Sequence, residues 1–496
     1  MQTRFSKSLQ KNQELMEQLI QPDKNNDLII RPFFALGQKC TLYYIDGMAS
    51  GEHVAQHIIR PMLEYAGEEP SGDLAQFALE HCITAPEIML EKEPEAAMIQ
   101  MLRGQCLVLL DSSANGIVID LRGYARRTVG QPINEKVIVG PHEAFNETLR
   151  DNLTLLHKKL PSKNLMCTML EVGTEIGSQM AICYLEGACP ERTIRELEKR
   201  INRAALDTVP SVGILQQLIE DDPFAPLPQA VLTERPDRVI SFLLEGQAAL
   251  ILDGSPRALV MPINLWHLFH APDDTNMRWQ YGCAMRFLRM FGAAAALLLP
   301  ALFVSLYTFH PTLLPMTLLT NIMQSRTVVP ISMYGEAILL LCIFDLINES
   351  GIRAPELMTS SLGLVSTLIL GTAAVEAKLV SPLLLIVVAL SGLGSFALPD
   401  YSLAFSFRMA QLLFVLVGGI TGLGGVCLLL LLFLCWVGSM ESLGAPYLAP
   451  TSPQRMHNPD LLRRAPLFRL RLRGYLSDVF HVKRASGRMR RFETRK

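Results

Sequence analysis

The first half of the chain is rich in polar residues, and the second half is rich in apolar residues. Five long apolar stretches occur after the middle of the chain; they are Met290–Phe309, Ile331–Ile347, Ser360–Val375, Leu379–Pro399 and Met409–Met440. A helix rises about 1.5 Å per residue and needs about 20 apolar residues to cross the hydrocarbon of a membrane. Ser360–Val375 is short for a crossing. The pattern predicts that these stretches are membrane helices. The alternative is that they are buried helices of a large soluble core.

Basic residues at the ends of the apolar half predict its topology. Arg278, Arg286 and Arg289 precede the first apolar stretch, and the tail Arg455–Lys496 carries thirteen basic residues against three acidic ones. Lys and Arg near the ends of spans stay on the cytoplasmic side, so we expect both termini in the cytoplasm and an even number of crossings. We predict four, at 284–309, 331–348, 379–399 and 409–437, with 360–375 as a re-entrant segment.

An internal repeat occupies the polar half. The segment Lys92–Asp111 aligns with Thr233–Asp253, and a constant offset of 142 places Pro94 on Pro236 and Gly104 on Gly246. Proline suits the first turn of a helix, and glycine suits the residue after its last turn. Each segment therefore predicts a helix followed by an apolar strand, within two similar α/β units.

We expect a duplicated α/β cytoplasmic region followed by a polytopic α-helical membrane domain. Between the α/β units, apolar residues within 144–160 are spaced for one face of a helix, which we expect to pack the units together. The predicted divisions are a polar N-terminal segment 1–29, a first α/β unit 30–150, a second unit with its linker 151–283, a transmembrane domain 284–440 and a basic cytoplasmic tail 441–496.

Composition narrows the class of protein. Of 496 residues, 50% are hydrophobic and only 19% are charged, which is too apolar for an ordinary soluble enzyme and excludes a disordered chain. The polar start of the chain, as far as Asn26, lacks the apolar run of a signal peptide. Ten cysteines without a CxxC pair argue against a zinc site or a disulfide framework and favour thiols in a reducing compartment.

Catalytic motifs are missing from the sequence. It contains no P-loop, HExxH, GxSxG or dinucleotide fingerprint, so we expect a protein that is not an enzyme and needs no cofactor. His53 and His57 lie four residues apart on a predicted helix and could share a metal, but two histidines on a solvated face are commoner. We predict no metal site and no nucleic-acid partner.

Ionisable residues within the apolar half are candidates for an ion pathway. Charges at membrane depth are costly and usually face a bundle interior or water. Glu336 and Asp345 lie within an apolar stretch, and Glu376 directly follows one. Glu336 and Asp345 lie nine residues apart, about 180° around a helix, so only one of them can line a given path. The alternatives are that both lie hydrated near the membrane surfaces, and that Glu376 is a loop residue paired with Lys378.

Three further features have competing interpretations. The run Arg235, Pro236, Asp237, Arg238 is either a helix start or an interface formed by its two arginines. Glycines within 418–425 have the spacing of close helix packing. The basic tail either lies on anionic headgroups or simply anchors the topology.

Several motifs together support a resemblance to a known family. They are VIVGPHEAFNETLRDNL (137–153), TERPDRVISFLLEG (233–246), RFLRMFGAAAALLLPALFVSLYTFHP (286–311), GTAAVEAKLVSPLLLIVVAL (371–390), ALPDYSLAFSFRM (397–409, with Pro399 and Asp400) and GAPYLAP (444–450). With these motifs the chain resembles the A subunits of spore germinant receptors, the GerA family. It departs from the family pattern at 171–178, where a basic stretch is usual, and at Thr312, where the family usually has glutamate.

The resemblance implies a function and a set of partners. It implies an integral protein of the spore inner membrane that works with a transporter-like B subunit, which senses the germinant, and a lipoprotein C subunit. The A subunit is expected to form a homo-oligomeric, cation-conducting channel in contact with membrane lipids. The sequence resembles equally well a paralogue with the same architecture, stage V sporulation protein AF. The rival classes are a secondary transporter with a regulatory domain and a scaffold with anchoring helices.

Overall fold

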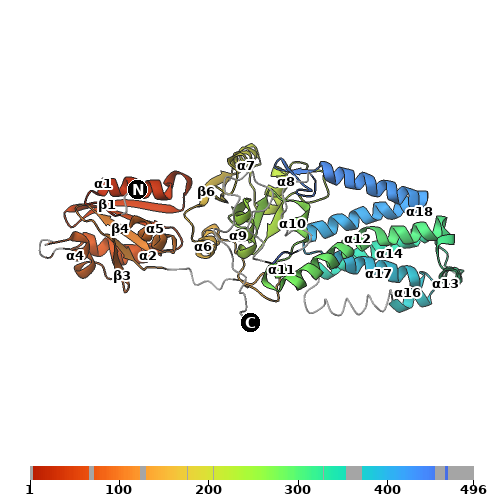
Figure 1. The fold of residues 1–496 in the computed structure, drawn as a ribbon. Coiled ribbons are helices and arrows are strands. Elements are labelled where there is room, and N and C mark those ends of the chain that lie inside the picture. Colours follow the sequence, from red (N-terminus) through yellow and green to blue (C-terminus); the bar gives the residue numbers. More distant parts are fainter. Residues whose placement is uncertain are drawn as a thin grey trace, which may run out of the picture. The chain divides into compact units, whose positions relative to one another are not determined.

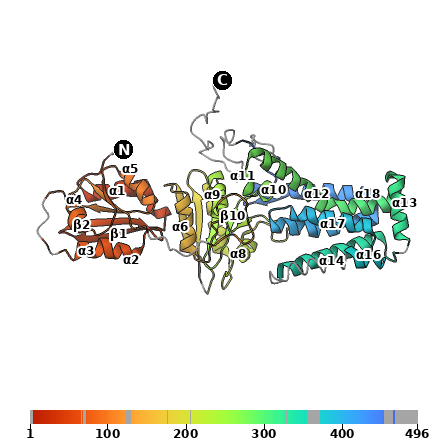
Figure 2. The same cartoon turned by 90° about the horizontal axis from the view of Figure 1, so that it is seen from below.

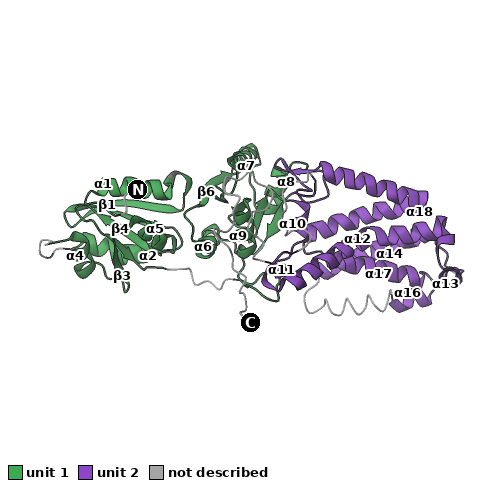
Figure 3. Cartoon of the chain, in the orientation of Figure 1, with its two compact units in different colours: residues 1–223, 230–263, 470–496 green, residues 224–229, 264–469 purple. Residues whose placement is uncertain are grey.

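A computed structural model describes residues 4–452, except 66, 68–71, 123–129, 176, 205, 328 and 354–370, together with residues 464–466. The chain forms two compact units (Figure 3). Unit 1 includes Met1–Pro223 and Ala230–Ile263, and unit 2 includes Phe224–Gln229 and Asn264–Arg469. The two units are described separately below.

Unit 1 contains two α/β repeats with the same topology (Figure 1). The first repeat consists of α1 (Leu9–Ile20), β1 (Leu28–Ala35), β2 (Gln38–Ile45), α2 (Gly51–Val54), α3 (Arg60–Leu63), α4 (Leu74–His81), β3 (Ile88–Glu91), α5 (Pro94–Leu102), β4 (Cys106–Leu110) and β5 (Gly116–Ile119). The second repeat consists of α6 (Leu149–Lys159), β6 (Leu165–Val172), β7 (Ser178–Leu185), α7 (Glu191–Arg203), α8 (Val212–Ile219), β8 (Val231–Thr233), α9 (Pro236–Glu245), β9 (Ala248–Leu252) and β10 (Ala258–Met261). The strand orders β1-β2-β4-β5-β3 and β6-β7-β9-β10-β8 are equivalent, and all pairs are antiparallel.

The predicted duplication is confirmed at the aligned residues. Pro94 and Pro236 are the first residues of α5 and α9, where a missing N–H costs no helical hydrogen bond. Gly104 and Gly246 both have φ of 96°, a conformation that glycine adopts without strain. The sequence offset therefore reflects one supersecondary unit used twice.

The duplication also includes the N-terminal helix, which corrects the predicted boundary at residue 29. The backbone N–H of Leu9 donates to Asp111 over 3.0 Å, and that of Leu149 donates to Asp253 over 2.9 Å. Helices α1 and α6 thus occupy equivalent places. Met16 of α1 is fully buried among residues of β4 and α5, so residues 9–20 belong to the first repeat.

Unit 2 is mostly helical. It consists of α10 (Leu265–Phe269), α11 (Asp273–Asn276), α12 (Trp279–Phe309), α13 (Met316–Arg326), α14 (Met333–Arg353), α16 (Ala374–Glu376), α17 (Pro382–Phe396) and α18 (Tyr401–Ser439), with the short strands β11 (Glu441–Ser442) and β12 (Ala445–Pro446). Helices α12, α14, α17 and α18 run side by side and are called the bundle here (Figures 1 and 2). Its core is apolar and includes Leu297, Leu340, Leu384 and Phe414.

Helix α18 is a hairpin of two arms, which corrects the prediction of one crossing at 409–437. Gly422 breaks the helix with φ 71° and ψ −159°. The rings of Phe414 and Phe433 lie 6.2 Å apart, whereas a straight helix would separate these residues by about 28 Å. In Figure 1 the two arms meet at the α18 label.

Helices α14 and α17 run parallel, whereas the predicted scheme requires them to run in opposite directions. Glu336, in the first turn of α14, accepts a hydrogen bond from the backbone N–H of Ser381, the residue before α17. Further along, Phe344 of α14 contacts Phe396 at the end of α17, with ring centroids 5.8 Å apart. The predicted order of crossings is therefore wrong for this pair of helices.

Two described helices, α12 and α18, are long and apolar enough to cross a membrane. Only 17% of the most apolar window of α18 is buried inside the chain, so most of that apolar surface needs an apolar environment from elsewhere. Most of the predicted re-entrant segment 360–375 and most of the basic tail lie outside the described residues. Arg464 of the tail is buried in unit 2 and donates to the carbonyls of Thr275 and Met277.

Candidate functional site in the helical bundle

A buried ion pair lies at one end of the bundle. Arg326 at the end of α13 donates from Nη1 to Oε2 of Glu336 over 2.6 Å and from Nη2 to the carbonyl of Ile331 over 2.9 Å. Glu336 is 0% exposed, and its other oxygen accepts the Ser381 N–H. A carboxylate in the first turn of a helix also faces the positive end of the helix dipole. The charge of Glu336 is thus neutralised inside the chain.

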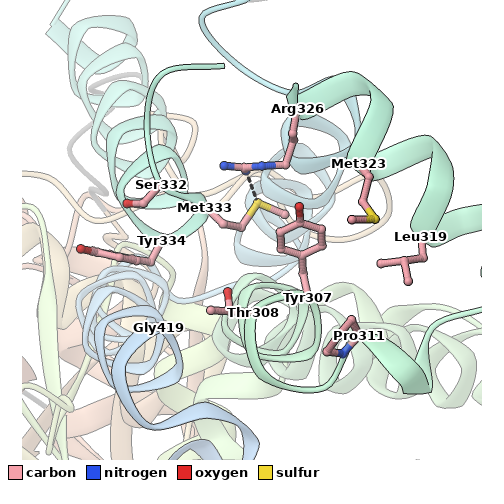
Figure 4. A pocket seen from close by; sticks show the side chains of 10 residues that line it. All are labelled: Tyr307, Thr308, Pro311, Leu319, Met323, Arg326, Ser332, Met333, Tyr334 and Gly419. Atoms are coloured by element: carbon pink, nitrogen blue, oxygen red, sulfur yellow. Dashed lines mark hydrogen bonds between the residues drawn. The ribbon is translucent and has the colours of Figure 1, made fainter. Parts of the chain in front are cut away.

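A pocket of about 500 Å³ lies beside this ion pair (Figure 4). The Arg326 guanidinium lies 5.5 Å from the centre of the Tyr307 ring and contacts the sulfur of Met333. The pocket is lined by Tyr307, Thr308, Pro311, Leu319, Met323, Arg326, Ser332, Met333, Tyr334 and Gly419. This lining offers aromatic and thioether surface but no carboxylate, so the pocket itself is a poor cation site.

Asp345 forms the second charged pair of the bundle. Its carboxylate lies 3.5 Å from Nη1 of Arg408 on the first arm of α18. Arg408 is 9% exposed and lies near the rings of Tyr401 and Phe405, at 6.0 and 5.9 Å. The Asp345 side chain is 38% exposed. From its position in α14, it lies about 18 Å from the start of the helix and about 12 Å from its end.

The three predicted pathway residues are not brought together. Glu336 contacts α13 and the start of α17, Asp345 contacts α18, and Glu376 is exposed at the end of α16. Within the described residues no ion pair links Glu376 with Lys378. Sequence reasoning missed Arg326 and Arg408 as partners, although each is a lone basic residue next to an apolar stretch.

The Thr233–Arg238 run holds the linker between the repeats of unit 1. Arg235 is fully buried and donates to Asp237 over 2.8 Å and to the carbonyl of Pro141 over 2.9 Å. Arg238 pairs with Glu135. Pro236 and Asp237 lie in the first turn of α9. Both arginines therefore bind groups of this chain, within unit 1.

Glu234 completes this attachment. It accepts backbone N–H groups of Ile133 and Asn134 at 3.0 and 3.3 Å and a hydrogen bond from Arg257 at 3.0 Å. Burial opposes its charge, but these donors outweigh burial and hold the pKa of Glu234 below its ordinary value. The ionised carboxylate is therefore the form that fixes the linker.

Pro399 and Asp400 mark the start of α18. Asp400 is the N-cap of the helix, and its side chain accepts the N–H of Leu403 over 2.9 Å. Near the other end of α18, the hydroxyls of Ser442 and Tyr447 donate to the carbonyls of Gln229 and Pro228, over 2.8 and 2.7 Å. The contacts of Ser442 and Tyr447 fasten the segment after the hairpin to residues 228–229 of unit 2.

An apolar bundle that carries two charged pairs, preceded by duplicated α/β repeats, defines a two-unit protein whose helices α12 and α18 are long and apolar enough to cross a membrane. The chain belongs to the family described as Bacillus/Clostridium GerA spore germination protein, which matches residues 14–475. The predicted family is thereby confirmed.

Relatives match the chain over most of its length. Spore germination protein B1 of Bacillus subtilis (strain 168) is 33% identical over 90% of this chain and 92% of its own. Spore germination protein GerLA of Bacillus cereus is 32% identical over 89% of both chains. An uncharacterized membrane protein of Bacillus subtilis, YfkQ, is 32% identical over 89% of this chain and 86% of its own.

A solved structure also matches part of the chain. It is the N-terminal domain of the A subunit of the Bacillus megaterium spore germinant receptor GerK3, which is 20% identical. The match covers 52% of this chain and 96% of that domain, with a TM-score of 0.42.

Proposed function

We propose that this protein is the A subunit of a spore germinant receptor in the spore inner membrane and that its bundle oligomerises around a cation-conducting path. It acts without enzymatic chemistry or a cofactor, with both termini in the cytoplasm. Its partners are membrane lipids, further copies of the chain, a transporter-like B subunit and a lipoprotein C subunit. Membership of the germination family and the names of its relatives support the receptor assignment.

The exposure of Asp345 is the observation that supports an oligomeric channel. A carboxylate 38% exposed on a bundle helix, well away from both ends of that helix, would face hydrocarbon in a single copy of the chain. Arg408 lies 3.5 Å away and only partly covers it. Charged groups at membrane depth face protein or a water-filled path because facing lipid is costly. A ring of neighbouring copies would give Asp345 either of these environments.

Among the three predicted pathway residues, Asp345 is therefore the best candidate to line the path. Rings of carboxylates select cations in channels because they partly replace the hydration of the ion. Glu336 is fully buried and neutralised by Arg326, so it has a structural role in our proposal. Glu376 is exposed near the start of α17 and is the candidate for the mouth of the path.

Cation flux from proteoliposomes tests the proposal. We expect the purified chain to release K⁺ from loaded vesicles and Asp345→Asn to reduce the flux severalfold. Glu441→Gln is the control, since Glu441 is an exposed carboxylate that follows α18 and lies outside the bundle helices, whereas Glu349, one turn after Asp345, shares its helix face. Cross-linking in the same vesicles should yield multimers. Reconstituted, folded protein that neither conducts cations nor forms multimers would contradict the channel.

A further inference from the structure

A compact cluster of metal-ligand side chains lies inside unit 1. Asp27 precedes β1, His157 lies on α6, and Cys167 lies on β6, so the cluster joins segments far apart in the sequence. Their donor atoms, a carboxylate oxygen, an imidazole nitrogen and a thiol sulfur, all lie within 4.8 Å of one another. All three side chains are almost completely buried. The site joins a loop of the first repeat to the second.

A fourth ligand is available on the neighbouring strand. Cys183 on β7 is the register partner of Cys167, and the two sulfur atoms lie 3.5 Å apart. This distance is far longer than the roughly 2.05 Å of a disulfide bond. Cys183 is fully buried as well. The combined set is two thiols, one imidazole and one carboxylate.

The spacing of these donors is close to that of a tetrahedral zinc site. Zn–S bonds of about 2.3 Å and Zn–N bonds of about 2.05 Å place sulfur about 3.6 Å from nitrogen and about 3.8 Å from a second sulfur. The observed distances are 3.8 Å from Cys167 Sγ to His157 Nε2 and 3.5 Å between the sulfurs. Asp27 and His157 are closer, at hydrogen-bonding distance, and this contact would widen when a metal replaces the shared proton.

Unsatisfied polar atoms mark the same cluster. Among the described residues, Oδ1 of Asp27 and Nδ1 of His157 are buried without a hydrogen-bond partner. Such atoms are uncommon in folded proteins because their desolvation is uncompensated. A cation beside the Asp27 carboxylate would offset the cost of burying Oδ1 of Asp27.

We propose that Asp27, His157, Cys167 and Cys183 bind one zinc ion that fastens the first repeat to the second. Thiolate and imidazole ligands favour zinc over magnesium or calcium, and a fully buried set of ligands is typical of structural rather than catalytic sites. The surroundings suit a fastening role. The backbone N–H of Cys167 donates to Asn25 over 3.3 Å, so the loop that carries Asp27 already pairs with β6.

Metal analysis of the full-length protein in detergent tests the site. We expect one equivalent of zinc per chain after purification with zinc present. After exchange into Co²⁺ we expect the visible bands of tetrahedral cobalt and a thiolate-to-metal charge-transfer band. Cys167→Ala and His157→Gln should each lower the bound metal at least tenfold. Cys189→Ala, which removes another buried thiol of the second repeat, should leave it unchanged.

The cobalt spectrum of the unaltered protein decides the question even if a variant does not fold. Folded protein that binds neither zinc nor cobalt would overturn the proposal. Cobalt bands that persist in Cys167→Ala would overturn it as well. A mass two hydrogens lower, with Cys167 and Cys183 blocked to alkylation, would show a disulfide in place of a metal site.

Discussion

Replacing Gly422 with alanine tests the hairpin form of α18. Gly422 has φ 71° and ψ −159°, a region of backbone conformation that is essentially restricted to glycine and costs other residues about 1–3 kcal/mol. An added Cβ would also lie 3.0 Å from Cγ of Phe309 on α12. Relieving this contact costs about 1 kcal/mol more in a packed core. We expect Gly422→Ala to destabilise the bundle by about 2–4 kcal/mol.

Gly424→Ala is the matched control on the same hairpin. No heavy atom lies within 4 Å of a Cβ built at Gly424, and alanine favours a helix over glycine by about 1 kcal/mol. This variant should be neutral or slightly stabilising.

Thermal unfolding of both variants in the same detergent measures the difference. At roughly 2–4 °C per kcal/mol for a unit of this size, Gly422→Ala should lower the Tm by about 5–15 °C relative to Gly424→Ala. Equal Tm values would show that α18 continues without a turn at Gly422. In that case the hairpin would be wrong, and with it the correction to the single crossing predicted at 409–437.

Two further predictions concern charged groups. Arg326→Met should destabilise the bundle by about 3 kcal/mol because it leaves the Glu336 carboxylate buried without its cation. Arg353→Met, which breaks an exposed pair, should cost less than about 1 kcal/mol. Equal Tm values of the two variants in detergent would contradict this prediction. The lowered pKa of Glu234 means that its contribution to stability is present above the unfolded value near 4.5 and is lost as the pH falls through the folded value. Denaturant titrations from pH 7 to pH 3 should therefore show a smaller loss of stability for Glu234→Gln, and an unchanged pH dependence would contradict the role of the carboxylate.

The duplicated α/β region could be predicted because its signals are local. A proline that opens a helix, a glycine that ends it and an apolar strand recur at a fixed offset, so Pro94 and Pro236 identify equivalent positions without any tertiary information. The place of α1 in the first repeat could not be predicted in this way. Its equivalence to α6 depends on hydrogen bonds to Asp111 and Asp253, far away in the sequence.

The bundle was harder to predict because hydropathy does not record where a helix turns. Met409–Met440 is apolar throughout, and the cluster of glycines around Gly422 is equally compatible with helix packing and with a turn. The Arg326–Glu336 pair depends on how α13 packs against α14. The cluster around His157 has no ligand spacing in the sequence, because Asp27 lies 130 residues away and comes from the other repeat.

Channel activity is the central claim for this protein, and its ion selectivity in planar bilayers tests that claim most directly. Under a KCl gradient, we expect the unaltered protein to give a reversal potential near the K⁺ equilibrium potential. Asp345→Asn should move the reversal potential toward zero, and Glu441→Gln should leave it in place. Currents without cation preference, or an unchanged reversal potential in Asp345→Asn, would contradict a path lined by Asp345.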